Sequence, residues 1–293
     1  MSRSSDRFET LALKGVGHQF RAGGELVPTI AGVDLEVGRS EFVTVVGPSG
    51  CGKSTLFNLA AGLLRPTAGQ VKVNGEPLEG TNPYVAYMFQ QAALLEWRDV
   101  LGNVVLGQEF LGMPKGEARA AAMEGLAEFG LSGFERRRAW ELSGGMRQRV
   151  ALLRTYLTQR ELLLLDEPFG ALDALTRLQM QQFLLDRWQR DQRTVIFITH
   201  DVDEALLLGD RVIVLAPRPT YVLATVEVGF ERPRNAEEVL RAPEFTELKT
   251  QMLEMLVVDS ESEVEPDGSA NGSGPGRPAE AERSARQDAG SGE

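Results

Sequence analysis

The chain has 293 residues, 42% of them hydrophobic and 25% charged, which predicts a sizeable core in one large domain or two small ones. Its formal net charge of −11 at pH 7 argues against a nucleic-acid binder that works by neutralising phosphates. A single cysteine, Cys51, excludes an intrachain disulfide and fits a reducing compartment, and the sequence contains no run of about 18 apolar residues that would predict a membrane span.

Short β-prone runs and one helix alternate in the first third of the chain. Leu11 and Leu13 alternate with polar or small residues, which predicts a short strand before Gly15. A glycine-rich loop separates a second strand, Phe42–Val46, from a helix predicted over residues 54–64. The remaining elements of this part are strands over residues 71–73 and 85–89 and a tight hairpin turn at Asn74-Gly75.

The next part of the chain combines a helical block with an alternation of strands and helices. Between Val100 and Gly130 the apolar residues recur at helical spacing, and Pro114 separates two helices. Because strands that alternate with helices form parallel sheets covered on both faces, the block over residues 100–158 is predicted to be an insertion in an α/β core. The alternating elements are strands over residues 162–165, 194–198 and 211–215 and helices over residues 143–158, 174–190 and after Asp201.

The residues between the second strand and the first helix meet the phosphate-loop pattern G-x-x-x-x-G-K-[ST]. Glycines let successive backbone N–H groups turn toward an anion, and the helix that follows adds its positive N-terminal end. Lys53 supplies a charge for the β- and γ-phosphates, and Ser54 supplies a hydroxyl for Mg²⁺. The competing interpretation is a glycine-rich turn that contains lysine by chance. The predicted nucleotide-binding residues are Gly47, Pro48, Ser49, Gly50, Cys51, Gly52, Lys53, Ser54 and Thr55.

Two acidic residues, Asp166 and Glu167, stand at the end of the apolar run 162–165. Carboxylates at the end of a buried strand are costly unless they meet a cation or a water network. Asp166 therefore suits Mg²⁺, directly or through a water, and Glu167 suits general-base or water-positioning work. The alternative is an acid-rich loop after a core strand, which the phosphate loop upstream disfavours.

A second glycine-rich helix start follows the helical block. Ser143 caps the predicted helix, and Gly144 and Gly145 let backbone amides approach an anion. By itself the pattern also fits an ordinary helix cap with flexible glycines. Only the first glycine-rich start carries a lysine and a magnesium ligand, which indicates that the second completes a site elsewhere.

Taken in order, the motifs resemble those of the ABC ATPase family over about residues 8–215. The resemblance implies an α/β fold, a P-loop NTPase (ABC ATPase) core with a mostly parallel sheet, an N-terminal antiparallel β subdomain and an inserted helical subdomain that carries the signature. In that family two domains pair head to tail and hold two ATP molecules between the phosphate loop of one and the signature of the other. The matching residues are Phe20, Gly47–Ser54, Gln90, Leu142–Gln148, Asp166-Glu167, Ala171-Leu172-Asp173 and His200.

The resemblance also implies roles for single residues. Phe20 matches the aromatic residue that stacks on adenine, and Asp173 matches the residue that signals across the dimer. Gln90 matches the glutamine that senses Mg²⁺ and the attacking water, and His200 matches the switch histidine that contacts the γ-phosphate. The implied sets are Glu167, His200 and Gln90 for catalysis, Ser54, Gln90 and Asp166 for the metal, and Ser143, Gly144, Gly145 and Asp173 for nucleotide contacts across the dimer.

Residues 167–177 and 199–205, with Met146 in the signature, resemble the importer branch for nitrate, sulfonates and taurine. Residues 94–98 resemble the segment that receives the permease, although Glu96 stands where proline is usual. The implied function is ATP hydrolysis, with ATP and Mg²⁺ as cofactors, that powers uptake of a small solute such as a nitrate-, sulfonate- or taurine-like anion. The implied partners are transmembrane permease subunits, a second ATPase subunit (expected to be a second copy), and, indirectly, a periplasmic or extracellular solute-binding protein, but no nucleic acid. The chain is then expected at the cytoplasmic face of the cell membrane.

The predicted domains are an ABC ATPase domain over residues 8–230 with its helical subdomain at about 95–160, a C-terminal helical appendage over 231–258, and a disordered acidic tail over 259–293. One alternative function is a non-transport ABC ATPase that acts on nucleic acid or ribosomes. The net negative charge and the single cassette disfavour it. A P-loop kinase or small GTPase is a further alternative, but it does not explain Leu142–Gln148.

Overall fold

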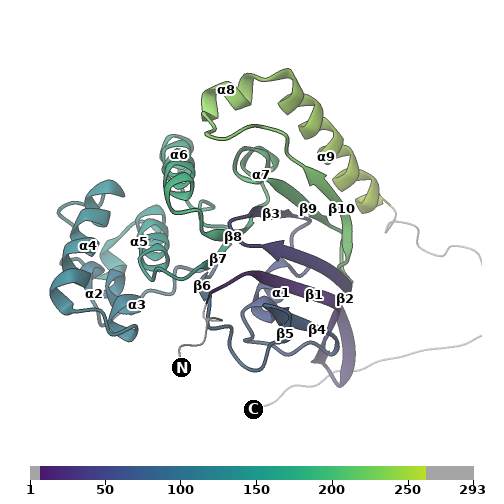
Figure 1. The fold of residues 1–293 in the computed structure, drawn as a ribbon, viewed down its shortest axis with the longest axis horizontal. Coiled ribbons are helices and arrows are strands. Elements are labelled where there is room, and N and C mark those ends of the chain that lie inside the picture. The colour runs from purple at the N-terminus through teal and green to yellow at the C-terminus, as the bar shows by residue number, and fades with distance from the viewer. Residues whose placement is uncertain (1–6, 262–293) are drawn as a thin grey trace, which may run out of the picture.

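The computed structural model describes residues 7–261, which form two sheets with helices packed beside and between them (Figure 1). A four-stranded antiparallel sheet has the order β2-β1-β4-β5, and a six-stranded sheet has the order β10-β9-β3-β8-β7-β6. Within these residues the structure contains no helix whose length and hydropathy suit a membrane span. The strands of the first sheet are β1 (Thr10–Ala22), β2 (Glu25–Gly38), β4 (Ala68–Val73) and β5 (Glu76–Pro77).

The first strand is longer than predicted, and the strand that pairs with it was not expected from the sequence. β1 continues through Gly15, which has a φ of 57°, and its register with β2 shifts between Leu13 and Val16. A glycine at positive φ allows such a β-bulge, so the strand bends without ending. The predicted hairpin at Asn74-Gly75 is confirmed, because it joins β4 to β5.

The second sheet confirms the prediction of a mostly parallel sheet. All of its neighbouring strands run parallel except β10, which pairs antiparallel with β9. Each predicted strand of this sheet is present, although β6 ends one residue before Phe89. The strands are β3 (Phe42–Val46), β6 (Val85–Met88), β7 (Leu162–Asp166), β8 (Thr194–Ile198), β9 (Arg211–Leu215) and β10 (Val222–Glu227).

The core divides into two clusters, one on each face of the parallel sheet. Leu162 and Leu164 of β7 belong to the cluster shared with the antiparallel sheet and α1 (Lys53–Ala60). Leu163 and Leu165 belong to the cluster on the opposite face, which α6 (Ala174–Asp191) and α7 (Val202–Leu208) cover. Successive side chains of a strand point to opposite faces, so an unbroken apolar run fills both clusters.

The helix that follows the phosphate loop, α1, ends four residues before the predicted Leu64. The chain turns at Gly62, which has a φ of 70°, and a Cβ there would lie 2.0 Å from the carbonyl oxygen of Gly80. The side chain of Asn82 donates to the carbonyl of Ala60 at 3.2 Å. Contacts with residues distant in sequence therefore set the end of this helix.

The inserted helical block is confirmed between β6 and β7, and it projects from one side of the sheets, at the left of Figure 1. Pro114 precedes α4 as predicted, but the part before it forms two short helices instead of one. The helices of the block are α2 (Val100–Val104), α3 (Leu106–Phe110), α4 (Lys115–Glu128) and α5 (Gly144–Tyr156).

The last described elements are α8 (Ala236–Arg241) and α9 (Pro243–Glu261), which lie beside α7 and β10 (Figure 1). Arg234 anchors this part, because its buried guanidinium donates to the carbonyls of Leu207 at 3.0 Å and Gly209 at 2.7 Å, where α7 ends. The predicted disordered tail was placed from residue 259, but α9 continues through Glu261. The rest of that tail lies outside the described residues.

Candidate functional site

The phosphate loop lies between β3, the third strand in the order of the parallel sheet, and the start of α1. Gly50 and Gly52 have φ values of 78° and 119°, which residues other than glycine rarely adopt. A Cβ on Gly47 would lie 3.0 Å from both the Cβ and the carbonyl oxygen of Leu215, so the loop packs directly on β9. The positive φ values of Gly50 and Gly52 agree with the turn that the pattern predicts, and the close packing at Gly47 is an additional finding.

Lys53 lies inside this loop, with only 7% of its surface exposed. Its amino group donates to the carbonyls of Gly47 and Pro48, each at 2.8 Å. An ammonium prefers anionic oxygens to neutral carbonyls, because charge-assisted hydrogen bonds are the stronger kind. The side chain is therefore held over the loop, where its amino group can exchange the two carbonyls for the oxygens of a phosphate.

Asp166 ends β7 beside the start of α1 and is buried. Burial raises the pKa of its carboxyl group, a hydrogen bond from Ser54 and the charge of Lys53 oppose that rise, and the charge of Glu167 adds to it. A hydroxyl and a carboxylate at the mouth of a phosphate loop are the oxygen donors that Mg²⁺ takes together with phosphates and water. The described residues hold no group of three or more His, Cys, Asp or Glu that could bind a metal alone, and a magnesium ion that shares a nucleotide does not need one.

Glu167 is the residue on which the other predicted catalytic side chains converge. Nε2 of Gln90 donates to its Oε2 at 3.2 Å, and Nδ1 of His200 lies 3.5 Å from the same oxygen. Glu167 has a φ of 46°, a backbone region that is uncommon for residues other than glycine and that occurs often at functional sites. Its carboxylate remains partly exposed, so a water molecule can reach it.

A single cleft of ≈ 270 Å³ joins these parts. The phosphate loop forms one wall, and Gln90, Asp166 and Glu167 form the other. Of the predicted residues, the cleft therefore unites the phosphate loop, the acidic pair and Gln90, and His200 stands next to it. The lining residues are Ser49, Gly50, Gly52, Lys53, Ser54, Thr55, Gln90, Asp166 and Glu167.

Phe20 stands apart from the cleft, on β1, with 40% of its surface exposed. The ring of His18 meets it edge to face, with ring centroids 4.6 Å apart, and Nδ1 of His18 lies 3.1 Å from the carbonyl oxygen of Arg65. An exposed aromatic ring that a neighbouring ring holds in place keeps a face open for stacking. This support from His18 was not expected from the sequence.

The predicted signature residues are not brought to the cleft within one chain. Ser143 caps α5 as predicted, because its Oγ accepts from the N–H of Met146 at 3.2 Å, and Gly144 beside it is exposed. Asp173 caps α6 in the same way, through the N–H of Thr176 at 3.0 Å, and this bond holds the pKa of its carboxyl group below the usual range. All of these groups lie at the surface, open to a second molecule.

Sequence reasoning assigned no role to two residues that position the site. Gln148 of α5 forms hydrogen bonds with the backbone of Glu167 and Ala171. Arg154 donates to the carbonyls of Ala92 and Ala93, each at 2.9 Å, and so fixes the segment after Gln90. The available signal for Gln148 was its position on the apolar face of α5, at helical spacing from buried residues.

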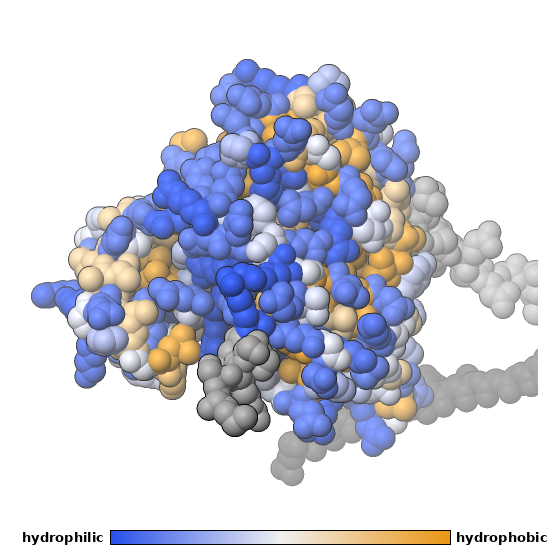
Figure 2. All heavy atoms as spheres, viewed as in Figure 1, coloured by the Kyte–Doolittle hydropathy of each residue, from blue (hydrophilic) through white to orange (hydrophobic). Residues whose placement is uncertain are grey.

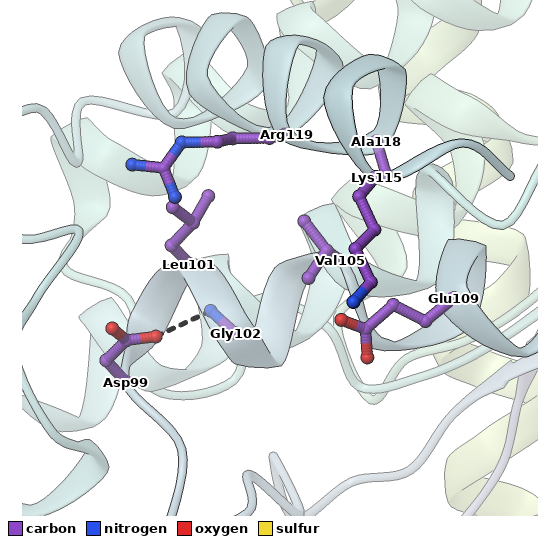
Figure 3. A pocket seen from close by; sticks show the side chains of 8 residues that line it. All are labelled: Asp99, Leu101, Gly102, Val105, Glu109, Lys115, Ala118 and Arg119. Atoms are coloured by element: carbon purple, nitrogen blue, oxygen red, sulfur yellow. Dashed lines mark hydrogen bonds between the residues drawn. The ribbon is translucent and has the colours of Figure 1, made fainter.

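A second cavity, of ≈ 260 Å³, lies within the inserted helices (Figure 3). It is bordered by α2, α3 and α4, and Lys115 points toward Glu109 across it. Asp99 caps α2 at its edge by accepting from the N–H of Gly102 at 2.7 Å. None of the predicted site residues lines this cavity, so it is separate from the phosphate loop cleft.

The chain has clear relatives among known proteins. The family described as ABC transporter matches residues 30–170. A taurine import ATP-binding protein, TauB, of Pseudomonas syringae pv. tomato is 43% identical over 247 residues, which are 83% of this chain and 94% of that protein. A putative ATP-binding protein of Brucella abortus is 47% identical over 220 residues, 75% of this chain and 84% of that one. A dimeric ATP-binding cassette in a post-hydrolysis state, bound to ADP and Pi, superposes with a TM-score of 0.69 and 31% identity and covers 75% of this chain and 100% of that one.

Proposed function

The chain belongs to the ABC transporter family and is an ATPase of import type, and from that premise we propose that it powers uptake of a taurine-like sulfonate, nitrate or a related small anion through a membrane permease. The convergence of Gln90 and His200 on Glu167, beside the phosphate loop, is the observation that carries the hydrolytic part. The likeness to taurine import proteins supports the class of solute.

The hydrolytic step follows from where the charged and polar groups stand. Lys53 leaves the carbonyls of the loop for the β- and γ-phosphates, and the backbone N–H groups from Gly50 to Ser54 surround the phosphate chain. Glu167 accepts a hydrogen bond from the attacking water and orients it toward the γ-phosphate. His200 and Gln90 hold that carboxylate. They would also contact the γ-phosphate, so catalysis consists of positioning and charge neutralisation.

The residues at the cleft also fit a magnesium ion. The hydroxyl of Ser54 and the carboxylate of Asp166 would hold it, and the amide of Gln90, which lines the same cleft, would contact it through water. When bound, the ion neutralises charge on the phosphate oxygens. Burial and the raised pKa of Asp166 indicate a carboxylate that gains from a nearby cation.

We further propose that a second copy of the chain completes the site. Phe20 and the phosphate loop form one half, and the exposed helix start at Ser143–Gly145 would bind the nucleotide of the partner. Asp173, which also lies at the surface, would contact the partner subunit. The dimeric arrangement of the related cassette bound to ADP and Pi supports this proposal.

The surface of the inserted helices is proposed to receive the permease. Trp97 is 74% exposed and Phe110 is 83% exposed, so both large apolar side chains are open to a partner. Figure 2 shows hydrophobic residues gathered on this part of the molecule, at the left of the view. Docking there would place the chain at the cytoplasmic face of the membrane and couple the permease to Gln90 through residues 90–99.

Reconstitution tests the proposal. The chain is purified together with a permease that it binds and placed in liposomes, and uptake of labelled taurine or nitrate is measured with and without ATP. ATP-dependent uptake is expected, and Trp97→Ala should abolish it while the ATPase activity of the isolated chain remains. Hydrolysis that responds to DNA or ribosomes, with no permease bound, would contradict the transport function.

A further inference from the structure

Gln148 stands on the buried face of α5, and both ends of its amide are bound by the loop after β7. Its Nε2 donates to the carbonyl of Glu167 at 2.9 Å, and its Oε1 accepts from the N–H of Ala171 at 2.7 Å. We propose that Gln148 is a positioning residue that links the helix of the signature glycines to the catalytic loop of its own subunit. The proposal rests on the role proposed above for Glu167.

The backbone of Glu167 needs external support. Its φ of 46° is a conformation that an L-residue adopts rarely, so surrounding contacts must hold it. On one side its N–H donates to the carbonyl of Ile198 on β8 at 3.0 Å. On the other side Gln148, only 6% exposed, holds its carbonyl oxygen. The position of the carboxylate therefore depends on α5 as well as on the sheet.

The signature itself packs on the same loop. A Cβ at Gly145 would lie 3.1 Å from the carbonyl oxygen of Ala171 and 3.1 Å from a methyl group of Leu172. At that spacing the start of α5 cannot move toward the loop without displacing it. Gln148 stands one turn further along the helix and is bound to the same Ala171.

These two contacts allow α5 to transmit a displacement to the loop after β7. The N-terminal end of α5 would contact the nucleotide of a second copy, whereas Glu167 serves the nucleotide of its own subunit. A shift of α5 when it contacts the partner's nucleotide is passed through Gln148 to the backbone of Glu167. Occupation of one site thus adjusts the geometry of the other within a single subunit, without a change in the phosphate loop.

Steady-state ATP hydrolysis by the full chain with Gln148→Met tests the inference. Methionine keeps the length of the side chain and removes both hydrogen bonds. We expect kcat to fall by about 10- to 100-fold, the effect of a misplaced catalytic group, with KM for ATP changed less than about twofold because the phosphate loop is untouched. Gln189→Met is the matched control, since Nε2 of that half-buried glutamine has no hydrogen-bond partner among the described residues.

A double variant separates positioning from general damage. If Gln148 acts through Glu167, adding Gln148→Met to Glu167→Gln causes no further loss of kcat, and an additive loss overturns the proposal. Gln148→Glu serves where the methionine variant fails to fold, because it keeps the acceptor for Ala171 and loses only the donor for Glu167. We expect a lowered kcat there too, and wild-type kcat in either soluble variant overturns the inference.

The two proposals fail in different ways. Full hydrolysis by Glu167→Gln alone would remove the assigned role of Glu167 and with it the basis for Gln148. Loss of hydrolysis by Glu167→Gln, together with wild-type kcat for Gln148→Met, would leave the proposed function intact and reject only the link through α5.

Discussion

Nε2 of Gln90 and Oε2 of Glu167 form a hydrogen bond of 3.2 Å between residues that are 77 positions apart. Gln90 follows β6 and Glu167 follows β7, and these strands are parallel neighbours in the sheet. The carboxyl ends of neighbouring parallel strands lie at the same edge, where α/β proteins bind their ligands. The bond thus connects the segment that leads to the inserted helices with the carboxylate beside the phosphate loop.

Glu167→Gln should retain ATP binding and lose turnover. The amide cannot take a proton from water, and general-base assistance contributes about 10²- to 10⁴-fold. We expect kcat to fall within that range and an ATP-stabilised dimer to accumulate, as measured by phosphate release and size-exclusion chromatography. Glu79→Gln, an exposed glutamate on the antiparallel sheet side, is the control. Wild-type turnover would remove Glu167 from the mechanism.

Lys53→Met should weaken nucleotide binding. The variant loses a charge-assisted contact to phosphate worth about 1.5–3 kcal/mol, which corresponds to about a 10- to 100-fold rise in the Kd for ATP. Calorimetry measures this value directly. Lys14→Met changes an exposed lysine of β1 and should leave Kd unaltered. Equal affinities for the two variants would mean that Lys53 of the wild type stays bound to the loop carbonyls when ATP binds.

Phe20→Ala should weaken ATP binding but not the binding of tripolyphosphate, which lacks a base. Loss of one aromatic stacking contact costs about 0.5–1.5 kcal/mol, or about a 3- to 10-fold rise in Kd. Phe20→Trp should restore affinity for ATP. A similar loss of affinity for both ligands would show that Phe20 supports the fold of β1 and does not stack on the base.

Arg234→Met should destabilise the protein without altering ATP contacts. Arg234 is a buried cation that holds carbonyls of Leu207 and Gly209, and its removal leaves those acceptors unsatisfied, at a cost of about 3 kcal/mol. Urea unfolding measures the loss. Arg241→Met removes an exposed ion pair with Glu237 and should change stability by less than about 1 kcal/mol. Equal stability of the two variants would contradict the anchoring role.

Glu204→Gln should change the pH dependence of stability. Burial raises the pKa of the Glu204 carboxyl group, the charge of Asp201 adds to the rise, and Thr199, Gln181 and Arg177 oppose it. A raised pKa means that the folded state holds the proton more tightly than the unfolded state, in which glutamate has a pKa of about 4.3. The contribution of Glu204 to the free energy of unfolding is therefore fully present below that pH. It is lost as the pH rises through the higher pKa of the folded state.

The measurement for this prediction is the difference in Tm between the wild type and Glu204→Gln. We expect the Tm of the wild type to exceed that of Glu204→Gln by more at pH 4 than at pH 8. Glu231→Gln, at an exposed glutamate, is the matched control. A difference that grows in favour of the wild type as pH rises would show that Arg177, 3.7 Å from the carboxylate, outweighs burial.

The contiguous parts of this protein could be predicted from its sequence. The phosphate loop, the strand Phe42–Val46 and the cap at Ser143 were visible because each depends on residues within a few positions of one another. The apolar run before Asp166 indicated a strand buried on both faces for the same reason. Local geometry and residue type are enough to specify these features.

Only the tertiary structure decided which of these parts meet. The strand order places Gln90 and His200 at the same oxygen of Glu167, and the bulges of β1 extend that strand to Phe20 and His18. The two hydrogen bonds of Gln148 likewise join α5 to a loop about twenty residues away. Such contacts depend on how sheets and helices pack, because hydrogen bonds and burial act at a few ångströms in space whatever the separation in sequence.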